Sequence, residues 1–181
     1  MDSLGRFGGP GYTLTSTERK PIMSRASQFA LDSEVGGGQV VALAGIGAQS
    51  ILRDAHANRL LRLPDASVDD NITYTLPPAE ATGDVYTFVL TKARTTTGLI
   101  FTVNAKPAST VMIGAVKSFD TAAVATDTAI WFSTNATTVT MNSTTQGGLG
   151  GDMLTFTDIG LGVWLLDGQT NCSGDKVTPL S

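Results

Sequence analysis

The chain is poor in the side chains that most enzyme chemistry uses. Its 181 residues include one cysteine and one histidine, and charged residues make up only 15%. In soluble domains about a quarter of all residues are usually charged. The single cysteine, Cys172, excludes an intrachain disulfide, and we expect it as a small, half-buried side chain. A zinc site needs several His or Cys ligands, so we expect no metal and no cofactor.

No catalytic residue is predicted either. The only histidine, His56, lies in Asp54-Ala55-His56-Ala57, just before the predicted β-domain, and we interpret it as structural. No Gly-x-Ser-x-Gly motif is present, and the glycine-rich stretches lack the phosphate-loop spacing. The three Glu residues are few, and most Asp residues, such as Asp84 and Asp167, are expected in turns. We therefore expect a protein that is not an enzyme.

The sequence also offers two weaker candidate binding sites. Asp69-Asp70-Asn71 clusters oxygen ligands that calcium could use, but the EF-hand spacing is missing and a solvated loop is favoured. Trp131, Trp164 and Tyr86 could stack on a sugar ring. Large aromatic residues inside apolar strands are more often core residues or subunit contacts, so we favour that interpretation.

The charge balance argues against some partners. The net charge is −4, which disfavours a nucleic-acid partner. Residues 1–62 hold seven basic and five acidic residues, whereas the rest of the chain holds five and eleven. The first third therefore suits an acidic partner better than the rest does. No apolar run reaches the length of a membrane span, and we expect no secretory leader, no membrane partner and synthesis in a cytoplasm.

The first 38 residues are predicted to be an extended arm. Glycines and a proline crowd residues 5–11, and the apolar residues are isolated from one another. Such a segment cannot bury enough apolar surface to fold alone, but it can lie along another protein; the alternative is a disordered leader. Gly36-Gly37-Gly38 marks a hinge. Residues 39–57 then form a connecting segment, with a short strand over 39–44 and either one or two helical turns or a further strand over 49–57.

Residues 58–181 are predicted to form an all-β domain of the jelly-roll or β-barrel kind. Short segments rich in Val, Ile, Thr and aromatic residues alternate with Gly, Pro, Asn and Asp turns. Leu63-Pro64 and Leu76-Pro77 are expected to mark strand boundaries. The predicted strands are Arg59–Leu63, Asn71–Leu76, Val85–Lys92, Gly98–Asn104, Thr110–Gly114, Ala129–Ser133, Thr137–Met141, Asp152–Thr157 and Gly162–Leu166.

Several of these segments carry a pattern seen in a known family. Asn-Arg-x-x-x-Leu-Pro (58–64), Gly-x-x-Tyr-x-Phe-Val-Leu (83–90), Gly-x-Ile-Phe-Thr-Val (98–103), Gly-Asp-x-Leu-x-Phe (151–156) and Gly-Val-Trp-Leu-Leu-Asp-Gly (162–168) follow one another along the chain. This succession resembles a β-domain of tailed bacteriophages that occurs in capsid decoration (cement) proteins and in some fibre proteins. The acidic stretch 65–71 departs from the family, whose members often have a short loop there.

The resemblance implies a homotrimer on the outside of a phage capsid, with amino-terminal arms that tie subunits of the major capsid protein together. The alternative is a tail-fibre or spike module that binds host surface glycans or attaches to the tail. On the first hypothesis the arm supplies apolar anchors and basic clamps. The candidate capsid-binding residues are Arg6, Phe7, Tyr12, Arg19, Lys20, Ile22, Met23, Arg25 and Phe29.

Overall fold

The computed structural model describes residues 39–43, 45, 47–64, 71–93, 98–103, 108–121 and 128–181. Residues 38–181 form one compact unit. The predicted arm, with all nine candidate capsid-binding residues, lies outside the described residues, as do Asp69 and Asp70 of the acidic loop.

Nearly all the regular secondary structure of the described residues is β-strand, which confirms the all-β prediction, and every predicted strand is present. Segment 49–57, for which a helical turn and a strand were both open, contains the end of one strand and a one-turn helix. The elements are β1 (Val40–Ala42), β2 (Ala48–Ser50), α2 (Arg53–His56), β3 (Arg59–Arg62), β4 (Ile72–Thr75), β5 (Val85–Val89), β6 (Leu99–Thr102), β7 (Val111–Asp120), β8 (Thr128–Ala136), β9 (Thr138–Met141), β10 (Met153–Gly160) and β11 (Val163–Cys172).

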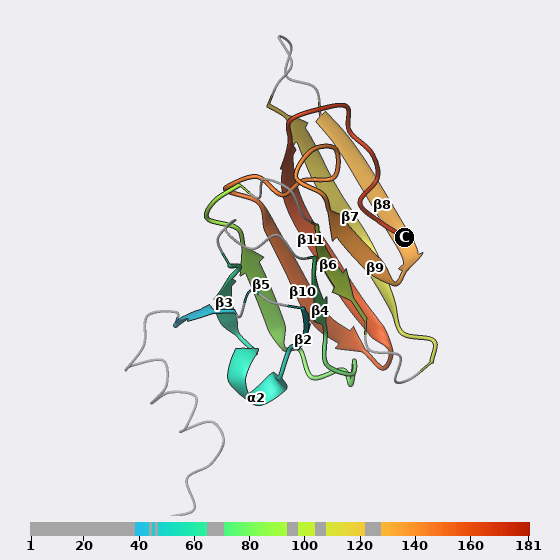
Figure 1. Ribbon diagram of the computed structural model, residues 1–181. Coiled ribbons are helices and arrows are strands. Elements are labelled where there is room, and N and C mark those ends of the chain that lie inside the picture. Colours follow the sequence, from blue (N-terminus) through green and yellow to red (C-terminus); the bar gives the residue numbers. More distant parts are fainter. Residues whose placement is uncertain are drawn as a thin grey trace, which may run out of the picture. The chain divides into compact units, whose positions relative to one another are not determined.

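The strands form two sheets. A seven-stranded sheet has the order β1-β3-β5-β10-β11-β7-β8, and a four-stranded sheet has the order β2-β4-β6-β9. From β1 to β6 the chain alternates between the two sheets, and each strand pairs in parallel with the one laid down two strands earlier (Figure 1). Jelly rolls are built from antiparallel strands. The finer jelly-roll prediction therefore stays a prediction, and these parallel ladders do not favour it.

The core lies between the two sheets and is rich in aromatic rings. The predicted alternation in β5 places Tyr86 and Phe88 on the inner face, and both are fully buried. Phe88 meets Phe101 of the four-stranded sheet with ring centroids 4.9 Å apart. Strands β3 and β4 end at Arg62 and Thr75, directly before the two Leu-Pro pairs, as predicted. Apolar alternation and proline thus place these strands correctly.

Four strands run past their predicted ends: β8 and β10 by three residues each, and β7 and β11 by six. Strand β7 continues past Gly114 to Asp120, and β11 continues past Leu166 to Cys172. The two strands pair in parallel along their whole length, from Val163 opposite Val111 to Cys172 opposite Asp120. This pairing overrides the local turn signals. Asp167 therefore lies within a strand and not in a turn, and Cys172 is fully buried, where a half-buried side chain was expected.

Candidate interaction surface

The side of the seven-stranded sheet that faces away from the core is the candidate functional surface, and we call it the outer face. Side chains alternate across a sheet, so the neighbours of each buried residue point outward. In β10, Leu154 and Phe156 are buried, which leaves Thr155 and Thr157 on the outer face. The same alternation continues in β5, β7, β8 and β11.

The strand register arranges the outer face in rows that cross the sheet. One row contains no charge and runs from Val85 through Thr157 and Leu165 to Ile113. A second row, which carries one charge, runs through Leu60, Thr87, Thr155, Asp167, Ala115 and Phe132. A third row runs through Arg62, Val89, Met153, Gln169, Lys117 and Ile130.

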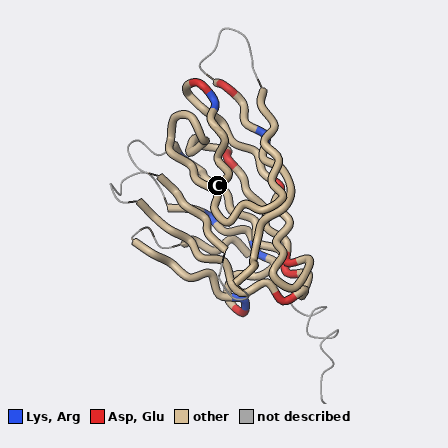
Figure 2. Tube along the Cα trace, turned by 90° about the vertical axis from the view of Figure 1, so that its right-hand side faces the viewer, with Lys and Arg blue, Asp and Glu red and all other residues tan. Residues whose placement is uncertain are grey.

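The outer face exposes large apolar side chains. Phe132 is 78% exposed, Ile130 49%, Met153 45% and Leu165 40%. Strands lie about 4.8 Å apart and side chains on one face about 6.8 Å apart along a strand, so the three rows, of four, six and six residues, cover roughly 500 Å², part of it polar. Contiguous exposed apolar patches larger than a few hundred Å² are rare on monomeric proteins and usually mark an interaction site. In Figure 2 most of the described trace carries no charge colour.

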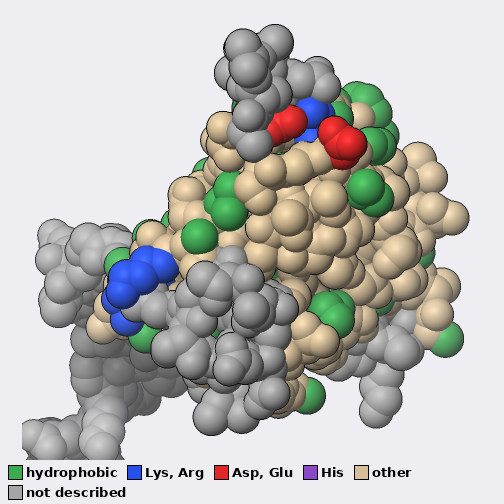
Figure 3. Space-filling model, turned by 45° about the horizontal axis from the view of Figure 1, so that its top comes forward, with side chains coloured by type: hydrophobic (Ala, Val, Ile, Leu, Met, Phe, Trp, Pro, Cys, Tyr) green, Lys and Arg blue, Asp and Glu red, His purple; other side chains and the backbone are tan. Residues whose placement is uncertain are grey.

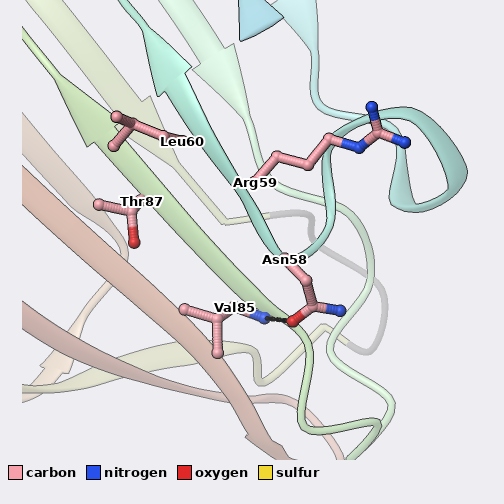
Figure 4. Close-up of a pocket in the computed structure, with 5 residues that line it drawn as sticks. All are labelled: Asn58, Arg59, Leu60, Val85 and Thr87. Atoms are coloured by element: carbon pink, nitrogen blue, oxygen red, sulfur yellow. Dashed lines mark hydrogen bonds between the residues drawn. The ribbon is translucent and has the colours of Figure 1, made fainter. Parts of the chain in front are cut away.

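A shallow hollow of about 380 Å³ lies at the β3–β5 end of this surface. Asn58, Arg59, Leu60, Val85 and Thr87 line it, and in Figure 4 the side chains of Leu60, Val85 and Thr87 point to the opposite side from the Arg59 guanidinium. Asn58 closes its lower end, where the side-chain oxygen accepts a hydrogen bond from the backbone N–H of Val85 at 3.2 Å. The hollow therefore has mainly apolar walls, which suit a side chain of a docked protein.

A cluster of charges gathers around Arg53 on α2. Its guanidinium donates to Asp84 at 2.5 Å, to Asp158 at 3.2 Å and to the Pro78 carbonyl at 2.7 Å. Glu80 adds a longer ion pair at 3.6 Å. Asp158 is fully buried on β10. The cluster joins three elements: α2, the loop before β5, and strand β10. Its charged side chains are paired with one another, so they are not placed to act on a substrate.

Hydrogen bonds keep the buried Asp158 ionised. Burial alone would raise the pKa of its carboxyl. The backbone N–H groups of Glu80 and Ala81 and the hydroxyl of Thr82 donate to it, and their combined effect lowers its pKa below the ordinary value. We infer that Asp158 is a structural anion and not a proton donor.

A second buried carboxylate, Asp152, clasps the loop before β10 to the end of β11. It accepts hydrogen bonds from the backbone N–H groups of Gly148 and Leu149, and from the backbone and side chain of Asn171. Here burial outweighs these bonds, and the pKa of the carboxyl is raised. Neither buried acid was singled out from the sequence, because partners of both lie far along the chain: Asn171 is 19 residues from Asp152, and Glu80 is 78 residues from Asp158.

The candidate sugar-stacking residues do not form a platform. Trp164 and Tyr86 are fully buried, and their rings pack edge to face with centroids 5.6 Å apart. Trp131 donates from its ring nitrogen to the Ser118 hydroxyl at 3.1 Å. The favoured interpretation of Trp164 and Tyr86 as core residues is confirmed, so neither can stack on a sugar.

The other sequence candidates lie apart from one another. The ring nitrogen Nδ1 of His56 accepts a hydrogen bond from the backbone N–H of Leu52 at 2.8 Å, within the turn of α2. The sulfur of Cys172 lies 3.2 Å from the Thr145 carbonyl, and burial raises the pKa of this thiol. The structure therefore brings neither of them into a shared site.

Three further observations concern metal binding, membrane spanning and the distribution of exposed hydrophobic side chains. Within the described ranges, no group of three or more His, Cys, Asp or Glu residues is placed to hold a metal ion. No helix found in that same part of the chain could reach across a bilayer. At the end of the molecule shown in Figure 3, the visible hydrophobic side chains form separate spots.

Comparison with protein-family models, with curated proteins and with solved structures finds no match to this chain. The resemblance to phage decoration proteins therefore stays an expectation. Sequence reasoning also missed the outer face, although one signal was present. Ile130-Trp131-Phe132 is apolar at three successive positions, so both faces of that strand had to be apolar.

Proposed function

We propose that the protein is a structural assembly protein, a homotrimeric capsid cement or decoration protein on the outside of a phage head. The observation that carries this proposal is the outer face. Its exposed apolar residues span neighbouring strands, and its charges are few: Arg62, Lys117 and Asp167. A surface of this composition favours contact with protein over contact with a charged polymer or a small polar substrate.

The partner that suits the outer face is another copy of the chain. A standard interface buries about 800 Å² on each partner, and the three rows of the outer face supply roughly 500 Å² of that area. The face carries charges of both signs, so like-charge repulsion does not oppose contact between copies. The trimeric state itself comes from the phage resemblance and its finer jelly-roll or barrel expectation.

The contact with the major capsid protein is assigned to the arm, residues 1–38. Its apolar residues, such as Phe7, Tyr12 and Phe29, would fill grooves between capsid subunits, while Arg6 and Arg25 would pair with acidic groups. Three arms on one trimer bind at high effective concentration, so weak individual contacts add up to tight attachment. By bridging capsid subunits, such arms would help a filled head resist its internal DNA pressure.

Deletion of residues 1–34 tests the role of the arm. The truncated protein should keep its β-sheet circular dichroism and its oligomeric mass, yet fail to bind purified expanded heads in a co-sedimentation assay. Full decoration of heads by the truncated protein would remove the arm from this account. Retained mass with lost binding would leave the outer face as the contact between copies.

The alternative, a tail-fibre or spike module, predicts a different copy number. A head protein is present in hundreds of copies per particle, whereas a tail protein is present in a few dozen or fewer. Quantitative mass spectrometry of purified virions separates the two. Selective binding on a glycan array would also favour the tail module.

A further inference from the structure

The open edge of strand β8 is the least protected feature of the fold. Strand β8 has nine residues and lies at the end of the seven-stranded sheet, where β7 is its partner among the described strands. Its sequence, Thr-Ala-Ile-Trp-Phe-Ser-Thr-Asn-Ala, contains no charge and no proline. An edge strand presents unpaired backbone N–H and C=O groups, and proteins usually blunt such edges with charge, proline or short length.

The other sheet edges are protected in these ways. Strands β1 and β2 have three residues each. Strand β9 is covered by the chain's own carboxyl end. Thr138 N–H donates to the Ser181 carbonyl at 2.8 Å, Ser181 N–H donates back at 3.0 Å, and Thr140 N–H donates to the Pro179 carbonyl at 2.8 Å. Within the described part of the chain, β8 is thus the long edge without a cover.

We propose that β8 pairs antiparallel with β8 of a second copy across a two-fold axis. A dyad at Trp131 would place Ile130 opposite the partner copy's Phe132 and the reverse. Both residues lie on the outer face, so the outward apolar side chains would continue from one sheet into the other. Cross-strand pairs of aromatic and β-branched residues stabilise antiparallel ladders, and no like charges meet because β8 has none.

The strand also sets the length of the pairing. The register of β7 and β8 shifts beyond Gly114, where Met112 pairs with Ala136 and Gly114 with Ser133. One extra residue on β8 forms a bulge there, over Thr134 and Asn135, and bulges end regular pairing. The added ladder, which is symmetric about Trp131, therefore spans residues 129 to 133 and is short, which predicts an association that reverses on dilution.

In the proposed shell, the β8–β8 contact would lie between neighbouring trimers. Trimers that sit on three-fold positions of a closed lattice meet their neighbours across two-fold axes. A β8–β8 ladder would link neighbouring trimers, while the arms bind the capsid below. That placement depends on the proposed function, whereas the pairing itself does not.

Hydrogen exchange of the full-length protein tests the pairing at the backbone. In an open edge strand, alternate amides exchange freely because they point away from the sheet. We expect those amides over residues 129–133 to be protected at high protein concentration, at least tenfold, and to lose protection on dilution. Free exchange of alternate β8 amides at every concentration would overturn the proposal.

Two matched substitutions separate edge pairing from contact through the outer face. Ile130→Lys places a charge on the edge strand, and Leu165→Lys makes a similar change in the middle of the same face; the two positions are 49% and 40% exposed. Ile130→Lys should abolish the concentration-dependent protection of β8, and Leu165→Lys should keep it. Equal loss of protection in both variants would contradict pairing at the edge, and circular dichroism checks that each variant is folded.

Discussion

Arg53 on α2 and Asp158 on β10 are held together across 105 residues of sequence by a hydrogen bond of 3.2 Å. Asp158 has no exposed surface, and the guanidinium also donates to Asp84. The pair fixes the one helical turn against the middle of the seven-stranded sheet. The pair therefore attaches segment 39–57 to the sheet that carries the outer face.

Asp158→Asn should destabilise the fold by about 3 kcal/mol, because it removes the negative charge beside Arg53 and replaces one of two buried acceptor oxygens with an NH2 donor that faces other donors. Chemical denaturation followed by circular dichroism measures the change. Asp167→Asn on the exposed outer face is the matched control, and it should shift the free energy of unfolding by no more than about 0.5 kcal/mol. Equal effects of the two substitutions would deny Asp158 its structural role.

The stability difference between wild type and Asp158→Asn should depend on pH. The pKa of Asp158 is lowered in the fold from its ordinary value of 3.8, so its contribution is present above that value and is lost as the pH falls through the folded pKa. The difference should stay constant near neutral pH and shrink below about pH 4. A difference that grows on acidification would contradict this sign.

Asp152 should show the opposite dependence. Its pKa is raised in the fold, so its contribution is largest in acid and is lost as the pH rises through the folded pKa. The stability of the wild type relative to Asp152→Asn should therefore fall with rising pH. The same denaturation series, measured on both variants, checks the two signs together; a flat profile for Asp152→Asn would mean that its pKa is not raised.

Gly114→Ala should prevent stable folding. Gly114 has φ +134°, and a Cβ atom there would lie 2.0 Å from the Leu166 carbonyl oxygen on β11. Gly83 also has positive φ, +76°, but a Cβ there would meet nothing within 4 Å. Gly83→Ala should cost only about 1 kcal/mol of backbone strain. A folded, stable Gly114→Ala protein would show that β7 and β11 do not approach this closely.

Tyr86→Phe should be neutral or stabilising. The hydroxyl of Tyr86 is buried and has no hydrogen-bond partner among the described residues, and burial raises its pKa to about 12. Removing a buried hydroxyl that has no partner breaks no hydrogen bond. It also removes the desolvation penalty of that hydroxyl, which should raise the free energy of unfolding by about 1 kcal/mol. A melting temperature lowered by several degrees would reveal a hydrogen bond to this hydroxyl.

The inner faces of the strands could be predicted from the sequence, and the outer face could not. In β5, Tyr86 and Phe88 alternate with Val85 and Thr87, and a buried layer on one side is enough to explain that period. In Ile130-Trp131-Phe132 the period is lost, because both sides of β8 are apolar. A strand of that kind is expected to be buried on both sides, and only the tertiary structure tells that one side is open.

The lengths of β7 and β11 and the two buried acids were missed for a related reason. Asp167, Gly168 and Asn171 are turn residues by local preference, yet parallel pairing with β7 holds them in one continuous strand. The environment of Asp158 depends on Arg53, which is far away in sequence. Long-range pairing decides both features, and a single sequence gives no measure of it.

The most direct test of the account is the mass of the full-length protein in solution, measured by sedimentation equilibrium. We expect three times the 18.8 kDa of one chain, with reversible association of trimers into larger species at high concentration. Leu165→Lys on the outer face should dissociate the trimer. Leu161→Lys, at a 75% exposed position in the turn after β10, should leave it intact. A monomer at all concentrations, or equal masses for wild type and Leu165→Lys, would contradict the assignment of the outer face as the assembly surface.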